Sequence, residues 1–321
     1  MGNMRILDLV GNCRTIGISG HENPDGDCVG SCVGMALFLR KKLPGARVDI
    51  FLEKIPPELE SNIPGTDTVI HDYRTEVSRY DAFILLDTGT QRCGGAGPLF
   101  DKALCRINID HHISNPGCGD FNYIDGKAGS ACELVYDCID KEDLDAQIAQ
   151  ALYVGIVTDT GCFRFDSTRE STMQTAGKLM TYGFDFSSIV REVYYERSYI
   201  QMKVLGEAFR NAHLRADGLM ILSVMDRNMQ QKLNAGRMDM EGVSEQLVQT
   251  RGVDLSVFIY EVEEGLWRCS LRSNRIVNVS AIAQHIGGGG HIRASGCSVR
   301  PNDAAALADL IEEMALAQAG R

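Results

Sequence analysis

Apolar and polar positions alternate along the first half of the chain in a pattern that predicts strands and helices in turn. The continuous apolar run at 82–86 is typical of a parallel strand covered by helices on both faces. Apolar side chains recur at helical spacing over residues 29–37, which predicts a helix that ends at Leu43-Pro44-Gly45. Gly30 and Gly34 are expected to let this helix lie close to the sheet. The predicted strands are 15–19, 48–52, 68–70, 82–86, 105–109 and 121–125.

Further helices and a second set of strands follow. Strands that alternate with helices predict a doubly wound, mainly parallel α/β domain, and the later strands predict a smaller α/β domain. We expect a first domain at 1–190, a linker helix at 191–210 and a second domain at 211–321. The predicted helices are 130–139, 145–158, 169–182, 187–194, 198–210, 243–250, 279–285 and 303–316, and the strands are 219–224, 253–260 and 266–271.

Acidic residues and histidines stand where the predicted strands end. The strand at 105–109 runs directly into Asp110, His111 and His112. Ligands of open α/β sheets bind outside the carboxyl ends of the strands, so these side chains are expected to project into a crevice. Other segments place polar side chains similarly: His21, Asp25 and Asp27 after the first strand, Asp87 after the strand at 82–86, and Asp159 after the helix at 145–158.

Most of these residues also have an ordinary structural explanation. Asp25 or Asp27 could cap the helix that follows, with His21 incidental, and a lone aspartate such as Asp87 after a strand is commonly a helix cap. Two aspartates and a histidine within seven residues exceed what one cap requires. Asp159 differs, because a carboxylate at a helix C-terminus is unfavourable unless a cation offsets it.

A metal site would account for the whole set. So many carboxylates in one crevice cannot all stay ionised without a counter-charge. A divalent metal supplies that charge, and an oxygen-rich site with one or two imidazoles suits Mn²⁺ better than structural zinc. Two ions bridged by one carboxylate would activate water for in-line attack on phosphorus. The candidate residues are His21, Asp25, Asp27, Asp87, Asp110, His111 and Asp159.

Composition narrows the class of protein. The 321 residues are 44% hydrophobic and 23% charged, as expected of a globular chain of about two domains. No apolar run approaches the roughly 18 residues of a membrane span, and residues 1–13 lack the order of a signal peptide, so we expect a cytoplasmic protein that does not contact membranes. The eleven cysteines show no paired zinc spacing and are expected to be reduced. The net charge of -11 argues against long duplex nucleic acid as a partner, but it allows a short anionic substrate.

A glycine-rich stretch at 287–296 distinguishes the second domain. Four consecutive glycines predict an exposed loop whose N–H groups could cradle an anion, with His291 as its polar tip. A flexible linker is the alternative, although a linker here would divide a compact unit.

These segments carry a resemblance to a known family. HENPDGD, LLDT, DHH and TDTG occur in this order, and GGGGH follows in the second domain. Over essentially its whole length the chain resembles the DHH family of phosphoesterases with a DHH-associated C-terminal domain, most closely its bacterial nanoRNase and pAp phosphatase branch. The resemblance implies a catalytic domain at 1–190, a substrate-binding domain at 211–321 and an active-site cleft between them.

The resemblance also implies roles for individual residues. Two Mn²⁺ ions would share Asp87 as a ligand, and Asp110 would orient His111 while His112 touches the scissile phosphate, so Asp87, Asp110 and His112 form the implied catalytic set. The first ion would also be held by His21 and Asp25, and the second also by Asp27, His111 and Asp159. The implied substrate contacts are Arg272 and Ser273 of LRSN, and Gly288, Gly289, Gly290 and His291 of GGGGH.

The expected activity is Mn²⁺-dependent hydrolysis of short oligoribonucleotides to mononucleotides, with 3′-phosphoadenosine 5′-phosphate (pAp) as a further substrate. The nearest rival is a phosphodiesterase for linear dinucleotides such as pApA or pGpG. The alternative of another class is a non-catalytic nucleotide- or RNA-binding module, which the complete ligand set disfavours. A family II inorganic pyrophosphatase would share the N-terminal chemistry but lack GGGGH. The sequence leaves the oligomeric state open, including a homodimer.

Overall fold

Six parallel strands form the sheet of the first of two units, Met1–Glu196, in a computed structural model that describes residues 4–300 and 304–320. The spatial order is β3-β2-β1-β4-β5-β6, so the winding direction reverses between β1 and β4. Each strand lies within one residue of its predicted limits. The strands are β1 (Thr15–Ser19), β2 (Arg47–Phe51), β3 (Val69–Ile70), β4 (Ala82–Leu86), β5 (Cys105–Asp110) and β6 (Phe121–Ile124).

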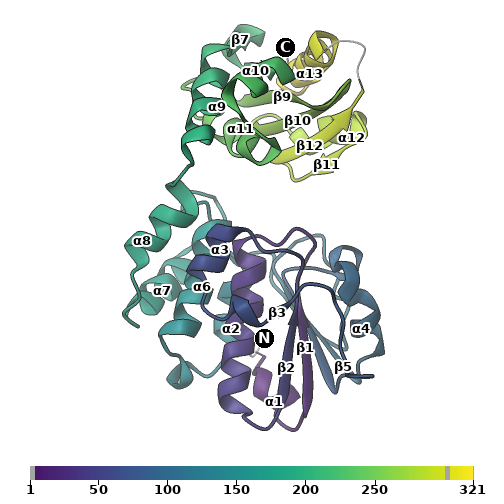
Figure 1. Cartoon of the computed structure of the whole chain (residues 1–321), viewed down its shortest axis with the longest axis vertical. Helices are drawn as coiled ribbons and strands as arrows, with labels where there is room; N and C mark the ends of the chain where they lie inside the picture. The colour runs from purple at the N-terminus through teal and green to yellow at the C-terminus, as the bar shows by residue number, and fades with distance from the viewer. Residues whose placement is uncertain (1–3, 301–303, 321) are drawn as a thin grey trace. The chain divides into compact units, whose positions relative to one another are not determined.

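Helices cover both faces of this sheet, as the doubly wound prediction requires. Figure 1 shows α2 and α6 on one side of β1 and β2, and α4 on the other. Two short helices, α1 and α3, have no counterpart among the predicted elements, because each is too short for a periodic pattern. The helices are α1 (Ile6–Val10), α2 (Gly26–Lys42), α3 (Pro57–Asn62), α4 (Gly97–Lys102), α5 (Ala131–Cys138), α6 (Ala146–Asp159), α7 (Glu170–Met180) and α8 (Phe186–Val190), which continues into a π-helical turn at Arg191–Tyr195.

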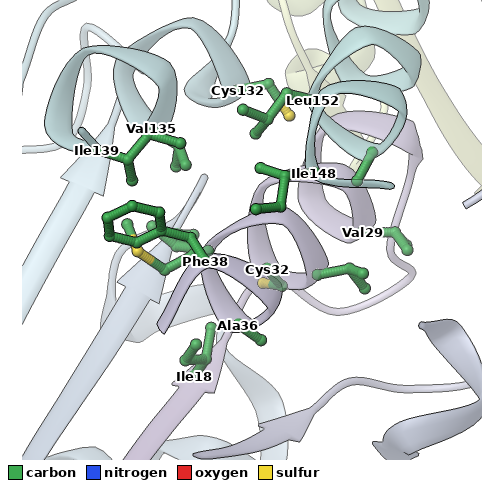
Figure 2. Close-up of a cluster of buried hydrophobic side chains, with 14 of the residues drawn as sticks. Ile18, Val29, Cys32, Ala36, Phe38, Cys132, Val135, Ile139, Ile148 and Leu152 are labelled. Atoms are coloured by element: carbon green, nitrogen blue, oxygen red, sulfur yellow. The ribbon is translucent and has the colours of Figure 1, made fainter. Parts of the chain in front are cut away.

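Alternate side chains of the strands face two different hydrophobic cores. On one face, Ile16 and Ile18 of β1 pack with α2, α5 and α6, and Figure 2 shows side chains of these helices lying close together. On the other face, Phe83 of β4 packs edge-on against Phe100 of α4, with ring centroids 6.1 Å apart. Burial on both faces explains why the strands read as continuous apolar runs.

Glycines bring α2 and α6 into close contact. A Cβ built on Gly30 would lie 2.4 Å from the carbonyl oxygen of Ala151, and one on Gly34 would lie 2.7 Å from Cδ2 of Leu152. The prediction that Gly30 and Gly34 allow approach to the sheet is therefore wrong, since these glycines face α6. Residues four apart share one face of a helix, and here that face meets another helix. The contact fixes the N-terminus of α2 beside the C-terminus of α6.

The second unit, Arg197–Arg321, contains a six-stranded sheet in the order β11-β12-β10-β9-β8-β7. Its neighbours run antiparallel except β8 and β9, which are parallel. The predicted helix at 303–316 corresponds to α13, although Asp303 lies outside the described residues. The elements are α9 (Tyr199–Arg210), β7 (His213–Arg215), β8 (Met220–Met225), α10 (Arg227–Leu233), α11 (Val243–Leu247), β9 (Leu255–Glu263), β10 (Leu266–Ser273), α12 (Val279–His285), β11 (Gly289–Gly290), β12 (Ala294–Val299) and α13 (Ala304–Gln318).

Helix α9 packs into the second unit. Its Val204 and Ala208 are buried with Ile221 of β8 and Phe258 of β9. The division at Glu196 therefore differs from the predicted limits, which placed this helix in a linker at 191–210. The functional roles assigned to the two domains stay a prediction. No helix among the described residues is long and apolar enough to cross a membrane.

Gly30→Ala should destabilise the protein, because the new methyl group cannot fit against the backbone of α6. Overpacking of this kind costs about 1–3 kcal/mol, more than the gain in helix propensity. Gly177→Ala is the matched control, since Gly177 lies in α7 with open space around its Cα, and it should stabilise by about 0.5–1 kcal/mol. Thermal denaturation followed by circular dichroism measures both. Equal shifts in the same direction would contradict the proposed close packing.

Candidate active site

Polar residues from five segments gather where the strand order of the first unit reverses. His21 follows β1, Asp87 follows β4, and Asp110 ends β5, as expected for a site at the carboxyl ends of parallel strands. The N-terminus of α2 and the C-terminus of α6 complete the cluster. Three groups have donor atoms within 4.8 Å of one another: His21, Asp25 and Asp87; Asp27, His111 and Asp159; and Asp87, Asp110, His111 and His112.

Asp87 joins these groups through its two oxygens. Its Oδ2 lies 3.3 Å from Nε2 of His21, and its Oδ1 lies 3.3 Å from Nε2 of His111. The side chain is buried, and Oδ1 is one of two buried side-chain atoms in the described part of the chain that lack a hydrogen-bond partner. Such an oxygen is unfavourable unless a cation binds it. The residues around Asp87 fit the binding of a divalent metal, while the individual ligand roles stay a prediction.

The backbone of Asp87 is strained. Its φ of 56° lies in the left-handed region, which aspartate tolerates better than most residues. Its N–H donates to the carbonyl oxygen of Ile109 at 3.0 Å, which ties the turn to β5. Strain of this kind costs on the order of 1–3 kcal/mol and persists only where the surrounding structure imposes it. The turn directs a buried carboxylate into the cluster.

Asp25 belongs to the cluster and also caps a helix. Its Oδ1 accepts hydrogen bonds from the N–H groups of Asp27 and Cys28, both at 3.1 Å, so the capping explanation is correct for this residue. The same oxygen lies 3.5 Å from Nε2 of His21. The Nδ1 of His21 is 2.8 Å from the carbonyl oxygen of Glu22, and a hydrogen bond donated there leaves Nε2 to face the carboxylates. Capping and metal binding are therefore compatible here.

Asp27 connects α2 to the start of α5. Its two oxygens accept from the N–H groups of Ala131 and Cys132 at 2.6 and 2.9 Å, which are unpaired donors at a helix N-terminus. Its Oδ2 also lies 3.7 Å from Nε2 of His111, and Oδ2 of Asp159 is 3.4 Å from the same nitrogen. Asp159 is the last residue of α6, so its carboxylate stands at the unfavourable helix end that the sequence indicated.

Mutual repulsion changes the ionisation of this cluster. Burial, followed by the nearby carboxylate of Asp87, raises the pKa of Asp27 to about 7. Burial and the charge of Asp27 raise the pKa of Asp159. Burial opposes charge on both imidazoles. Cys28, Asp25 and Asp87 nevertheless raise the pKa of His21 to about 12, and Asp87, Asp27 and Asp159 raise the pKa of His111 to about 10. The cluster thus retains protons in the absence of another cation, and a divalent cation is the group that replaces them.

Asp110 contacts His112, whereas the family resemblance implied that it orients His111. Its Oδ1 accepts from the backbone N–H of His112 at 3.1 Å and lies 2.7 Å from Nδ1 of that ring. The Nδ1 of His111 is instead 3.4 Å from the carbonyl oxygen of Ala128. The difference has a local cause, because an aspartate at the start of a turn commonly bonds the N–H two residues later.

Two asparagines that the sequence analysis missed hold Asp110 in place. The Nδ2 of Asn115 donates to Oδ2 of Asp110 at 2.6 Å and to Oδ1 of Asn108 at 3.0 Å. Asn108 is fully buried in β5 and donates to the carbonyl oxygens of Leu85 and Thr88. Asn108 could have been found from the sequence, because it is a polar residue within an otherwise apolar strand. Asn115 lies in a loop, where the sequence offers no comparable signal.

The predicted substrate residues of the second unit differ in accessibility. Arg272 forms an ion pair with Glu245 of α11, and its side chain is 28% exposed. Ser273 is buried, and its hydroxyl donates to the carbonyl oxygen of Val277 at 2.6 Å. Arg272 is thus paired within the second unit and Ser273 has a hydrogen bond of its own, and substrate contact by either residue stays a prediction.

The GGGGH segment is more ordered than the predicted loop. Gly289 and Gly290 form β11, which pairs with β12. The N–H of Gly288 donates to the carbonyl oxygen of Ala283 at 2.7 Å, and that of His291 donates to Ala294 at 2.7 Å, so neither is available to cradle an anion. Two of the glycines lie against β12, where a Cβ on Gly288 would be 2.5 Å from that of Cys297 and a Cβ on Gly290 would be 2.7 Å from Cα of Ser295. Substrate contacts by Gly288, Gly289, Gly290 and the exposed His291 stay predictions.

Comparison with known proteins identifies the family. Residues 15–156 match the DHH family, N-terminal domain, and residues 220–316 match the DHHA1 domain. The chain belongs to the DHH family. Several bacterial relatives, 25–29% identical over most of the chain, are named bifunctional oligoribonuclease and PAP phosphatase NrnA. The relative of that name from Bacillus subtilis is 29% identical over 303 residues, which are 92% of this chain and 93% of the relative.

Solved structures of DHH proteins share the fold. An exopolyphosphatase-related protein from Bacteroides fragilis has a TM-score of 0.88 and 23% identity, with 97% of this chain and 94% of that chain covered. RecJ from Thermus thermophilus, solved in complex with Mn²⁺, has a TM-score of 0.54 and 13% identity. The match covers 97% of this chain and 54% of RecJ. These likenesses support the two-sheet α/β architecture.

Asp87→Asn should reduce the binding of divalent cations at least 100-fold. The change removes the bridging negative charge while keeping the shape of the side chain, and asparagine tolerates the left-handed backbone. Mn²⁺ content after dialysis, measured by atomic absorption, checks this. Asp101→Asn is the control, because Asp101 is an exposed carboxylate on α4 of the same unit. Equal Mn²⁺ content in the two variants would exclude the bridging role.

Proposed function

We propose that this chain hydrolyses short oligoribonucleotides to mononucleotides and converts pAp to AMP. This activity would make the chain a hydrolase of phosphoric esters, which agrees with the names of its relatives in the DHH family. The observation that carries the proposal is the position of Asp87, whose two oxygens face the imidazoles of His21 and His111. The imidazoles and carboxylates arranged around this one buried carboxylate disfavour the alternative of a binding module that has lost catalysis.

Two Mn²⁺ ions are the proposed cofactor. His21, Asp25 and Asp87 would hold the first ion, and Asp87 would share in the second with Asp27, His111 and Asp159. When bound, such a pair activates water and stabilises both oxygens of an in-line displacement at phosphorus. Carboxylate oxygens with one or two imidazoles are ligands that suit Mn²⁺.

His112 is the proposed contact to the scissile phosphate. Asp110 holds its Nδ1 at 2.7 Å, and Asn115 fixes Asp110 in turn. The contact to one ring nitrogen fixes the plane of the imidazole, so Nε2 is the nitrogen left to face a phosphate oxygen. The chain of three side chains thereby orients the ring before substrate binds. Orientation of this kind lowers the reaction barrier by reducing the entropy lost at the transition state.

Arg272 and His291 are the proposed contacts to the distal part of the substrate. Arg272 forms an ion pair with Glu245. Before substrate binds, this pair compensates the charge of Arg272 and limits the rotamers of its side chain. A guanidinium recognises phosphate through two parallel hydrogen bonds. Binding energy from this remote contact can position the reacting phosphate, so it contributes to turnover as well as to affinity.

A cytoplasmic location and a homodimeric state stay predictions. The eleven cysteines are free thiols in the structure, which agrees with the expected reduced state. Fractionation of cells and analytical ultracentrifugation of the purified chain test these two points.

The proposed activity is tested by incubating the chain and Mn²⁺ with pApA, a five-nucleotide RNA, pAp, cyclic di-AMP and pyrophosphate. We expect mononucleotides from the first two, AMP from pAp, and no product from the last two; EDTA should abolish turnover. Cleavage of pApA alone would instead identify a linear-dinucleotide phosphodiesterase. Binding without hydrolysis of any substrate would contradict the enzymatic proposal.

Arg272→Ala should raise KM for pApA about 10-fold or more, because one charge-assisted contact to the distal phosphate is lost. Activity on a chromogenic phosphodiester without a second nucleotide should change much less, and Mn²⁺ content should not change. Steady-state kinetics on both substrates measure the effect. Equal losses on the two substrates would show that Arg272 does not recognise the distal end.

A further inference from the structure

A pocket of about 650 Å³ lies within the second unit, at the sheet edge where β8 and β9 begin and β10 ends. Its lining comes from the turn at 217–219, the segment 248–254 and the segment 274–276. The volume falls in the range of about 300–1,000 Å³ typical of small-molecule sites. No residue of the proposed catalytic function lines this pocket.

Hydrogen bonds within the second unit fix the walls of this pocket. The carboxylate of Asp254 accepts from the backbone N–H groups of Arg275, Ile276 and Val277 at 2.7–3.1 Å. The side chain of Asn274 donates to the carbonyl oxygens of Val248 and Val253 at 2.9 and 3.0 Å. These bonds join the segment 248–254 to the segment 274–276, so the pocket is formed before any ligand arrives. They also compensate the buried charge of Asp254.

Two arginines at the pocket, Arg251 and Arg275, are exposed. In the part of the chain that the structure describes, neither guanidinium forms an ion pair or a hydrogen bond. Arg215 and Arg272 of the same unit, by contrast, are paired with carboxylates. Two guanidiniums at one pocket offer parallel N–H donors of the kind that bind a phosphate group.

The remaining lining suits the other parts of a nucleotide. Ile276, 53% exposed, and the more buried Val248 and Leu219 provide an apolar surface for a base. Asp217 and Gln249 add acceptors for hydroxyl or amino protons, and carboxylates commonly bind ribose hydroxyls in nucleotide sites.

Charge is distributed unequally between the units. Residues 197–321 contain 14 basic and 14 acidic residues, so the whole excess of -11 lies in residues 1–196. An anion is therefore repelled less by the second unit than by a chain of uniform acidity.

We propose that this pocket binds a nucleoside monophosphate, with its phosphate on Arg251 and Arg275 and its base against Ile276. The choice of a nucleotide rests on the proposed function, whose product belongs to this class. The pocket is also linked to the GGGGH segment, because Arg293 donates to the carbonyl oxygens of Arg275 and Val277. Occupancy would hold the 274–277 segment, and through Arg293 the start of β12, in place.

The test is calorimetric titration of AMP into the full chain in EDTA, where metal ions do not contribute. We expect one binding event, weakened about 10-fold by Arg251→Ala and by Arg275→Ala, and lost in the double variant. Adenosine should bind at least 10-fold more weakly than AMP, because it lacks the phosphate. Arg275→Lys should retain part of the affinity, since it keeps the charge but loses the planar fork.

Two controls separate this site from other arginines. Arg227→Ala removes an exposed arginine of α10 and should leave AMP binding unchanged. Arg272→Ala removes the proposed substrate contact, so loss of AMP binding in this variant would place AMP at the catalytic site instead of the pocket. Thermal denaturation checks that the variants fold. Wild-type affinity in the double variant, loss of binding in Arg272→Ala, or no binding of AMP to the unmodified chain would overturn the proposal. The measurement needs no turnover, so AMP binding without hydrolysis of pApA would support the pocket and contradict the proposed function.

Discussion

Repulsion among buried carboxylates is the constraint on which the first unit depends. Asp87 is buried in a strained turn with Asp27 and Asp159 nearby, and the imidazoles of His21, His111 and His112 lie within 3.5 Å of its oxygens. In water these carboxylates would separate, but the fold holds them at the ends of strands and helices that cannot move apart. A bound cation relieves the repulsion, so the arrangement that costs folding stability also creates affinity for metal.

Close helix packing supplies the rigidity that this arrangement needs. A Cβ on Gly155 would lie 3.0 Å from Cα of Asp27, so the approach of α6 to α2 sets the position of that carboxylate. Asp27 then bonds the first N–H groups of α5, which couples a third helix to the cluster. The geometry of the site therefore depends on the packing of these helices, because a shift of any of them would move a donor atom.

The second unit uses a different principle. Its sheet edges are tied by backbone hydrogen bonds to Asp254 and by the guanidinium of Arg293, and its charge is balanced where the first unit is acidic. Arginines that remain accessible on such a neutral framework can bind phosphate without the competition of surrounding carboxylates. In the proposed function, the acidic unit would hold the metal ions and the neutral unit would bind phosphate.

The sequence by itself determined the strands of the parallel sheet, most helices and the acidic residues of the cluster, because apolar periodicity and strand-end polarity are local signals. The tertiary structure alone decided that Gly30 faces α6, that Asp110 holds His112, and that GGGGH is partly a strand. These outcomes depend on which surfaces meet and on where a turn directs a side chain. The pocket was equally hidden, since Arg251 and Arg275 are 24 residues apart in the sequence and only the folded sheet brings them together.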